Sequence, residues 1–223
     1  MLNWAARYFP ILRLLKERLA ETDSLLEVGS GAVGIGKYYR RPFVGCDLSF
    51  SFRPKAPMVP LIASGTNLPF TDRSFDAVVA SDVLEHVPPE LRSVVIQETL
   101  RVARKIAIFG FPSGQPAFEY DLKLAEAYDR SPQERPVWLE EHLRYQPFPS
   151  EALFENLGAG WMVNTLGNES VGFHTWVIIQ EMHNTRTYFF KGLLRTFPRA
   201  MESLLRLADH EPYYRKIVVL RRA

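Results

Sequence analysis

The chain has 223 residues, among them 27 lysines and arginines, 25 aspartates and glutamates, and one cysteine. This length suits one α/β domain with a full core, and the near balance of charge gives no electrostatic reason to expect nucleic-acid binding. A single cysteine excludes an internal disulfide, and no apolar run approaches the roughly 18 residues of a membrane span. We therefore expect a cytoplasmic protein.

The first half of the chain alternates short apolar runs with helical patterns. Apolar residues recur at helical spacing over Ala5–Ala20 and predict a first helix. The strands and helices expected after it are, in chain order, strand Ser24–Val28, helix Gly34–Arg41, strands Phe43–Cys46, Met58–Ala63 and Ser74–Ser81, a helix from Pro89 to about Ala103, and strand Lys105–Gly110. This alternation predicts a parallel sheet with helices on both faces.

The second half is less regular. Prolines and aromatic residues punctuate residues 113–150, which we expect to form a lid or insertion over the carboxyl edge of the sheet, with a helix over Phe118–Tyr128. Ser150 is the expected cap of the next helix. The elements expected after it are strand Trp161–Leu166, a broken helical region from about Phe173 to Leu207, and a last strand, Tyr214–Leu220.

We therefore expect a single domain over residues 1–223. Its parts are an N-terminal helix (1–23), a ligand-binding half (24–112), the lid or insertion (113–150), and a C-terminal half with a helical excursion and the last strand (151–223).

The most informative segment is the apolar run that ends at Val28 and is followed by glycines at positions 29, 31 and 34. The G-x-G-x-x-G spacing predicts a tight turn into a helix, where backbone approaches a ligand closely. Glu27 is unusual at this point, and suits a site for a cationic amino-acid group or a hydroxylated sugar. Asp47 follows the next strand, where a carboxylate can accept hydrogen bonds from both ribose hydroxyls. The alternatives are an ordinary tight turn for the glycines and a helix N-cap for Asp47.

Four blocks resemble, in order and spacing, the class I S-adenosylmethionine-dependent methyltransferases in their broad small-molecule branch. They are Leu26–Gly31, Val44–Ser49, Asn67–Phe70 with Ser74–Val78, and Asp82–Val87, and together they cover roughly residues 24 to 112. The resemblance implies a Rossmann-like methyltransferase fold. This is an α/β, doubly wound, mostly parallel seven-stranded sheet with helices on both faces and an antiparallel last strand.

The resemblance also implies S-adenosylmethionine as cofactor and S-adenosylhomocysteine as product. The expected cofactor-binding residues are Glu27, Gly29, Gly31, Asp47, Ser64, Gly65, Leu68 and Ser81. Ser64 stands where the family often has an acid that accepts a hydrogen bond from the adenine amino group. This departure puts that hydrogen bond in doubt.

His86, in the fourth block, is the candidate general base. Related segments lie near the transferable methyl group, and imidazole has a suitable pKa for taking a proton from a hydroxyl. The alternative is that His86 only anchors its loop through hydrogen bonds. His142 and Tyr145 are the candidate substrate contacts; the alternative is a surface loop with a structural histidine. No cysteine–histidine cluster and no evident carboxylate set for Mg²⁺ are present, so no metal is expected.

The expected function is methyl transfer to a small-molecule or glycan-like acceptor, with oxygen slightly favoured. One alternative is an NAD-dependent oxidoreductase, which shares the glycines and Asp47 but not Glu27. Another is a non-catalytic binding protein on the same fold, to which Ser64 points. The expected partner is the acceptor and not nucleic acid. The basic amphipathic stretch 187–207 allows peripheral membrane contact or a homodimer contact, as well as burial in the domain.

Overall fold

The computed structural model describes residues 2–130, 132, 134–155, 157, 160–181, 192, 193, 196 and 198–223. A seven-stranded sheet lies at its centre, in the order β3-β2-β1-β4-β5-β7-β6. The strands are β1 (Leu25–Val28), β2 (Phe43–Asp47), β3 (Met58–Ile62), β4 (Phe75–Ser81), β5 (Ala103–Pro112), β6 (Trp161–Ser170) and β7 (Tyr213–Arg222). Neighbours among β1 to β5 pair in parallel, whereas β7 is antiparallel to both β5 and β6. The predicted fold class is confirmed.

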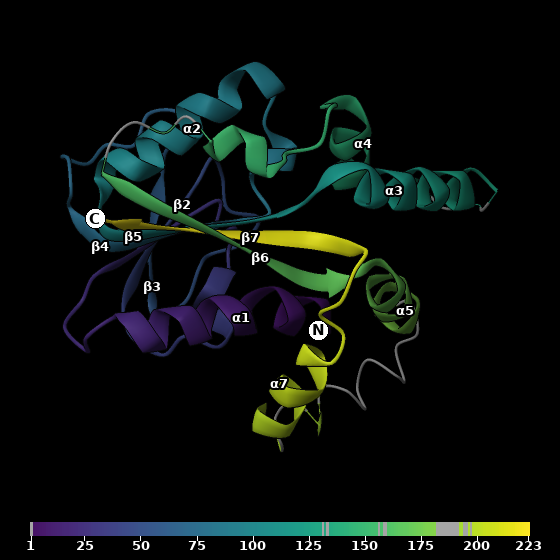
Figure 1. Cartoon of the computed structure of the whole chain (residues 1–223), viewed down its shortest axis with the longest axis horizontal. Coiled ribbons are helices and arrows are strands. Elements are labelled where there is room, and N and C mark those ends of the chain that lie inside the picture. Colours follow the sequence, from purple (N-terminus) through teal and green to yellow (C-terminus); the bar gives the residue numbers. More distant parts are fainter. Residues whose placement is uncertain are drawn as a thin grey trace.

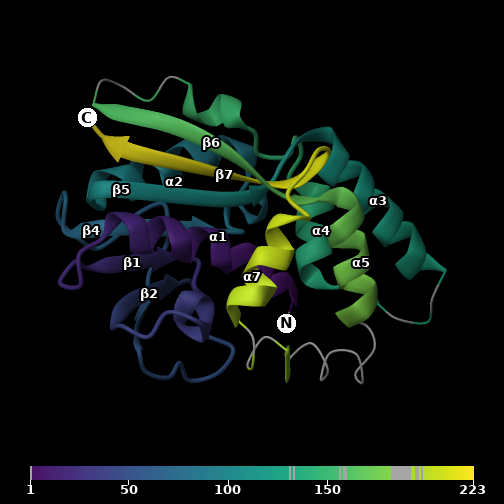
Figure 2. The ribbon, with the colours of Figure 1, turned by 60° about the horizontal axis from the view of Figure 1, so that its bottom comes forward.

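Helices cover both faces of this sheet. The α-helices described are α1 (Leu2–Arg18), α2 (Pro89–Val102), α3 (Gly114–Asp129), α4 (Val137–Arg144), α5 (Val171–Glu181) and α7 (Pro198–Arg206). Figure 1 shows α1 on one face and α2 on the other, and both ribbon views place α3 and α5 together at one end of the sheet (Figures 1 and 2). None of the described helices is long and apolar enough to cross a membrane.

The core is split between the two faces of β4, which is buried at every residue. Val78 and Ala80 pack into the cluster that includes Val95 and Ile96 of α2. The alternate residues Ala77 and Val79 pack into the cluster formed with α1. Successive side chains of a strand point to opposite faces, so a strand covered on both sides reads as one continuous apolar run. This explains why the Ser74–Ser81 stretch is almost entirely apolar.

The register of the central strands sets the position of the site. Val28 of β1 lies beside Cys46 of β2 and beside Ala80 of β4. Parallel strands end at the same edge of a sheet, so the segments that follow them emerge side by side. The glycine turn, Asp47 and the segment after Ser81 are therefore brought together at the carboxyl edge.

Two helices expected from the sequence are shorter in the structure. The expected helix Gly34–Arg41 is a 3-10 turn, η1 (Gly34–Lys37), because Gly34 enters it with φ of +50° and Pro42 follows soon after. The helix expected after Ser150 is the 3-10 turn η3 (Glu151–Phe154), and Ser150 makes no side-chain cap hydrogen bond.

The lid or insertion is more helical than predicted. Its expected helix Phe118–Tyr128 is the longer α3, and α4 follows it where no helix was predicted. Of the expected 173–207 helical region, α5 and α7 are described, whereas residues 182–191 lie outside the described residues. In α7, Met201 and Leu205 are buried against α1, as burial in the domain requires. Membrane and homodimer contacts of residues 187–207 stay predictions.

Candidate active site

A pocket of about 330 Å³ lies where β1, β2 and β4 end. Five of the predicted site residues line it: Gly29, Asp47, Ser64, Gly65 and His86. The other lining residues are Val28, Cys46, Leu48, Ala63, Thr66, Asp82, Val83, Val87, Val95 and Glu141. The pocket is thus lined both by residues of the glycine turn and by His86.

The glycine turn requires its glycines for space as well as for conformation. Gly29 has φ of +69°, and a Cβ built on it would lie 2.3 Å from Cγ2 of Val83. The backbone N–H groups of Gly29 and Ser30 donate to the carbonyl oxygen of Cys46, at 2.8 and 3.1 Å. Asp47 accepts a hydrogen bond from the N–H of Gly31 at 2.7 Å. The carboxylate of Asp47 therefore fixes the turn and also lines the pocket.

Glu27 points away from the pocket. Its Oε1 accepts a hydrogen bond from the hydroxyl of Tyr8 and its Oε2 accepts one from the N–H of Ile35, both at 2.8 Å. Burial raises the pKa of Glu27 to about 7, although both hydrogen bonds act to lower it. Glu27 thus joins α1 and η1 to β1, and its direct contact with a ligand stays a prediction.

The segment after β3 forms a second side of the pocket. The hydroxyls of Ser64 and Thr66 share a hydrogen bond of 2.8 Å, and the N–H of Thr66 also donates to Ser64 Oγ. A Cβ on Gly65 would lie 3.2 Å from a methyl group of Val28, so this segment packs closely on β1. Ser64 therefore offers a hydroxyl where related proteins often offer a carboxylate.

Besides Glu27, three of the predicted cofactor-binding residues do not line the pocket: Gly31, Leu68 and Ser81. Leu68 is buried in the core cluster on the α2 face, and its N–H donates to Glu98 at 2.8 Å. Ser81 is buried, and its Oγ has no hydrogen-bond partner among the described residues. Contact between these three residues and a cofactor stays a prediction.

His86 is paired with a carboxylate, Glu141, to which sequence reasoning gave no role in the site. It lies in the 3-10 turn η2 (Leu84–His86), and its Nδ1 is 2.7 Å from Oε2 of Glu141 on α4. Burial and the neighbouring His142 lower the pKa of His86, whereas Glu141 acts to raise it. A carboxylate only accepts hydrogen bonds, so Nδ1 carries the hydrogen, and Nε2 of the neutral ring is left as a proton acceptor.

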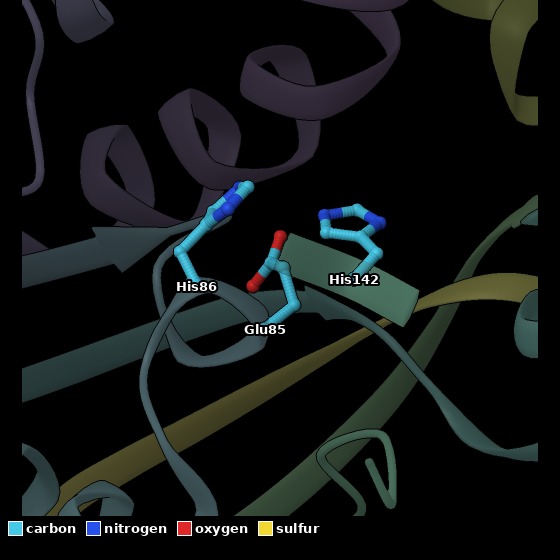
Figure 3. Close-up of side chains that lie close together, drawn as sticks. All are labelled: Glu85, His86 and His142. Atoms are coloured by element: carbon cyan, nitrogen blue, oxygen red, sulfur yellow. The ribbon is translucent and has the colours of Figure 1, made fainter. Parts of the chain in front are cut away.

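The other predicted contacts lie behind the pocket wall. His142 is buried, its Nδ1 is 2.7 Å from Oδ2 of Asp121, and its ring centre is 4.8 Å from that of His86. The backbone carbonyl of Tyr145 accepts a hydrogen bond from the guanidinium of Arg92. Glu85 is fully buried as well, and Figure 3 shows its carboxylate between the two imidazole rings. Burial, with the nearby carboxylate of Asp82, raises the pKa of Glu85 well above its usual range.

Asp82, which lines the pocket, is bound by the guanidinium groups of two arginines. Arg215 binds it through two nitrogens, at 3.0 and 2.9 Å, and Arg7 lies 2.5 Å from its Oδ2. Burial acts to raise the pKa of Asp82, but these guanidiniums outweigh it and lower the pKa to about 2. Asp82 and Glu85 belong to the same sequence block as His86. Their positions in the sequence do not show that the fold surrounds Asp82 with guanidinium groups and buries Glu85 beside two histidines.

Comparison with known proteins agrees with this geometry. Residues 26–111 match the model of the family described as a methyltransferase domain. No curated protein matches the chain by sequence.

Solved structures share the fold over nearly the whole chain. One is a protein from Galdieria sulphuraria described as a sarcosine dimethylglycine methyltransferase: it is 12% identical, 97% of this chain and 84% of that chain are covered, and the TM-score is 0.56. Another is a methyltransferase from an antibiotic biosynthesis pathway of Anabaena variabilis, at 12% identity, 96% and 98% coverage, and a TM-score of 0.55. A third comes from the complex of the Haloferax volcanii methyltransferase activator Trm112 with a methyltransferase, at 14% identity, 98% and 94% coverage, and a TM-score of 0.52.

The strand order and the pocket at the carboxyl edge of the sheet fit a Rossmann-like methyltransferase fold. Residues 26–111 of the chain are similar to a methyltransferase domain, and this similarity supports methyl transfer as the activity. The match favours methyl transfer over the oxidoreductase and the non-catalytic alternatives.

Proposed function

We propose that the enzyme transfers the methyl group of S-adenosylmethionine to an oxygen of a small-molecule or glycan-like acceptor. The observation that carries the proposal is one pocket lined by Gly29 and Asp47 and also by the His86–Glu141 pair. A nucleoside cofactor bound against Gly29 and Asp47 would present its methyl group toward the pair.

Asp47 is the residue proposed for the ribose. Its Oδ2 is engaged by the N–H of Gly31, and a carboxylate has further lone pairs that can accept from two hydroxyls. Gly29 and Gly65 are proposed to let backbone approach the cofactor, and Ser64 to lie toward its adenine.

His86 is proposed as the base that takes the proton of the acceptor hydroxyl. The leaving group of methyl transfer is already cationic, so alignment of nucleophile and methyl provides much of the acceleration and little acid help is needed. A hydroxyl is a weak nucleophile until its proton is removed, and the neutral ring of His86 can accept that proton at Nε2. This need for a base is what favours oxygen over a neutral amine.

Ligand-dependent unfolding tests the cofactor part of the proposal. We expect S-adenosylhomocysteine to raise the melting temperature and NADH to leave it unchanged, because a ligand stabilises the folded state that binds it. Asp47→Asn keeps an acceptor for Gly31 but removes the charge, and should weaken S-adenosylhomocysteine binding by about 1–3 kcal/mol. Asp129→Asn, on the exposed end of α3, is the matched control and should bind as the unchanged protein does. Equal affinity in both variants would remove Asp47 from the ribose role.

The acceptor part is tested by product analysis. Labelled S-adenosylmethionine is supplied with a panel of hydroxyl compounds and a matched panel of amines, and the methylated products are separated. Methyl ethers formed at a rate that falls in His86→Gln are the expected result. Methylated amines as the sole products would contradict the preference for oxygen.

A further inference from the structure

Three side chains that meet behind the pocket carry an inference beyond the transfer reaction itself. Glu85, His86 and His142 each offer one oxygen or ring nitrogen, and these atoms lie within 4.8 Å of one another. Figure 3 shows the carboxylate of Glu85 directed between the two rings. Two imidazoles and one carboxylate form a ligand set that divalent first-row transition metals bind.

Both rings are oriented as metal-binding histidines are. Nδ1 of His86 is held by Glu141, and Nδ1 of His142 is held by Asp121, both at 2.7 Å. A histidine ligand usually donates its other N–H to a carboxylate or a carbonyl, which fixes the tautomer and the ring plane. The Nε2 atoms of both rings are thereby left as the ligand atoms.

The polar atoms that face the cluster are unpartnered. Both carboxylate oxygens of Glu85 and Nε2 of His142 lack a hydrogen-bond partner among the described residues. Glu85 is 1% exposed and His142 is 4% exposed, so water reaches neither freely. Buried polar groups without partners are costly and rare, and a cation would satisfy all three atoms at once.

The arginines near the cluster bind groups other than Glu85. Arg92 is buried close to Glu85, but its guanidinium donates to the backbone carbonyls of Leu84, Val87, Tyr145 and Pro147. Arg7 and Arg215 are bound to Asp82. The carboxylate of Glu85 is therefore left for a further cation.

We propose that Glu85, His86 and His142 bind a divalent first-row transition cation at the acceptor end of the pocket. Ligand atoms about 2.1 Å from a metal lie roughly 3 Å apart, so the three side chains would close by small rotations. This inference revises the sequence-based expectation that no metal is bound. The cluster was not visible in the sequence because His142 lies far from the Glu85-His86 pair along the chain.

The chemical role of the cation rests on the proposed function, whereas its binding does not. His86 lines the pocket, so a coordination position on its side of the cation would be open to the acceptor, and a hydroxyl bound there would become more acidic. With the cation bound, the cation would activate the acceptor hydroxyl. Without the cation, the ring of His86 would take the proton itself. The proton passes to solvent, the hydroxyl oxygen takes the methyl group, and the sulfonium leaves as a neutral thioether.

Titration of chelator-treated protein with Co²⁺ tests the proposal, because Co²⁺ bound to imidazole and carboxylate ligands gives a visible absorption spectrum. We expect saturation at one equivalent. Glu85→Gln and His142→Gln should each weaken binding at least 30-fold. His210→Gln, which removes an exposed histidine outside the cluster, should bind Co²⁺ as the unchanged protein does. Equal Co²⁺ affinity in Glu85→Gln, His142→Gln and the unchanged protein would overturn the proposal, as would the absence of saturable binding.

Two further measurements keep the result interpretable. Circular dichroism and thermal unfolding without metal establish that each variant is folded. Glu85→Gln keeps the size of the side chain and cannot ionise, so it should stay folded even if His142→Gln does not, and it can carry the test alone. S-adenosylhomocysteine binding is measured on the same samples. Its retention with loss of Co²⁺ binding supports the metal site. If the unchanged protein does not bind S-adenosylhomocysteine, the proposed function is contradicted, whereas the Co²⁺ result still holds.

Discussion

At the scale of single residues, Glu27 shows how a motif residue can have a structural task. Sequence reasoning assigns it to the cofactor because an acid is unusual at the end of a first strand. In the structure its two oxygens hold Tyr8 of α1 and Ile35 of η1. The raised pKa means that the folded protein keeps a proton on this carboxyl at a pH where the unfolded chain has lost it.

This difference predicts a pH dependence of stability. The unfolded carboxyl titrates near 4.5 and the folded one near 7, so its contribution is fully present below pH 4.5 and is lost as pH rises through 7. The loss amounts to at most about 3 kcal/mol. Glu27→Gln cannot ionise and should gain stability relative to the unchanged protein between pH 5 and pH 8, as measured by urea unfolding. Glu119→Gln, an exposed substitution on α3, should show no such gain. A constant difference across this pH range would contradict the prediction.

The pair formed by His86 and Glu141 predicts a second pH effect, on turnover. Glu141 acts to raise the pKa of His86, so Glu141→Gln should lower that pKa further. A base works only when it is neutral, and the rise of turnover with pH should therefore move to lower pH in the variant. The maximum rate should fall as well, because a weaker base takes a proton less readily. The pH profile of kcat in metal-free protein measures both changes; an unshifted profile would leave His86 with an anchoring role.

The residues of the pocket wall were predictable to different degrees. Gly29, Asp47 and His86 stand inside sequence blocks whose order and spacing indicate one ligand site, and all three line the pocket. Glu141 and Arg92 come from outside those blocks. They reach the site only because α4 packs on η2 and because the guanidinium of Arg92 binds the carbonyls around it. Contacts between segments so distant along the chain leave no local pattern in one sequence.

At the scale of elements, strands were easier to place than short helices. A strand buried on both faces needs a continuous apolar run, and β4 has one. The 3-10 turns η1 and η3 lack such a signal, because a few residues after a glycine or a serine can begin a helix or end as a single turn. Helix α4 was missed because it has only eight residues and lies in a proline-rich stretch.

Arg92 is the link between two of these elements. From α2 it binds carbonyls of η2 on one side and those of Tyr145 and Pro147, after α4, on the other. A lysine has the charge but not the fork of donors. Arg92→Lys should therefore lower the free energy of unfolding by about 2–4 kcal/mol, since several buried carbonyls lose their donors. Denaturant unfolding beside Arg130→Lys, an exposed substitution just after α3, is the measurement. Equal stability of the two variants would contradict the role.

At the scale of the whole molecule, a chain of charged side chains, most of them buried, joins α1 to the strands β6 and β7 and to α5. It begins at Arg7 of α1, continues through Asp82 after β4 to Arg215 of β7, and ends at Glu169 of β6 with His174 of α5. Asp82 and Glu169 have φ of +53° and +60°, a conformation that side chains other than glycine seldom adopt. Strain of this kind persists where surrounding contacts hold it, and here Arg215 binds both acids.

Among the residues of this chain of charges, loss of Arg215 should therefore lower the free energy of unfolding most. Arg215→Met keeps much of the side-chain volume but leaves Asp82 and Glu169 each short of one cation, and removal of one partner from a buried ion pair typically costs about 3–5 kcal/mol. The low pKa of Asp82 adds a pH signature: the stability that it contributes is present above pH 4 and is lost as pH falls toward 2. The gap between Arg215→Met and the unchanged protein should therefore be wide at pH 7 and narrower at pH 3. Urea unfolding at both values checks this, with Arg206→Met, which removes an exposed arginine paired with the half-buried Glu202, expected to change stability by less than about 1 kcal/mol. A gap of the same width at both pH values would show that lost packing, and not the buried charge, accounts for the effect.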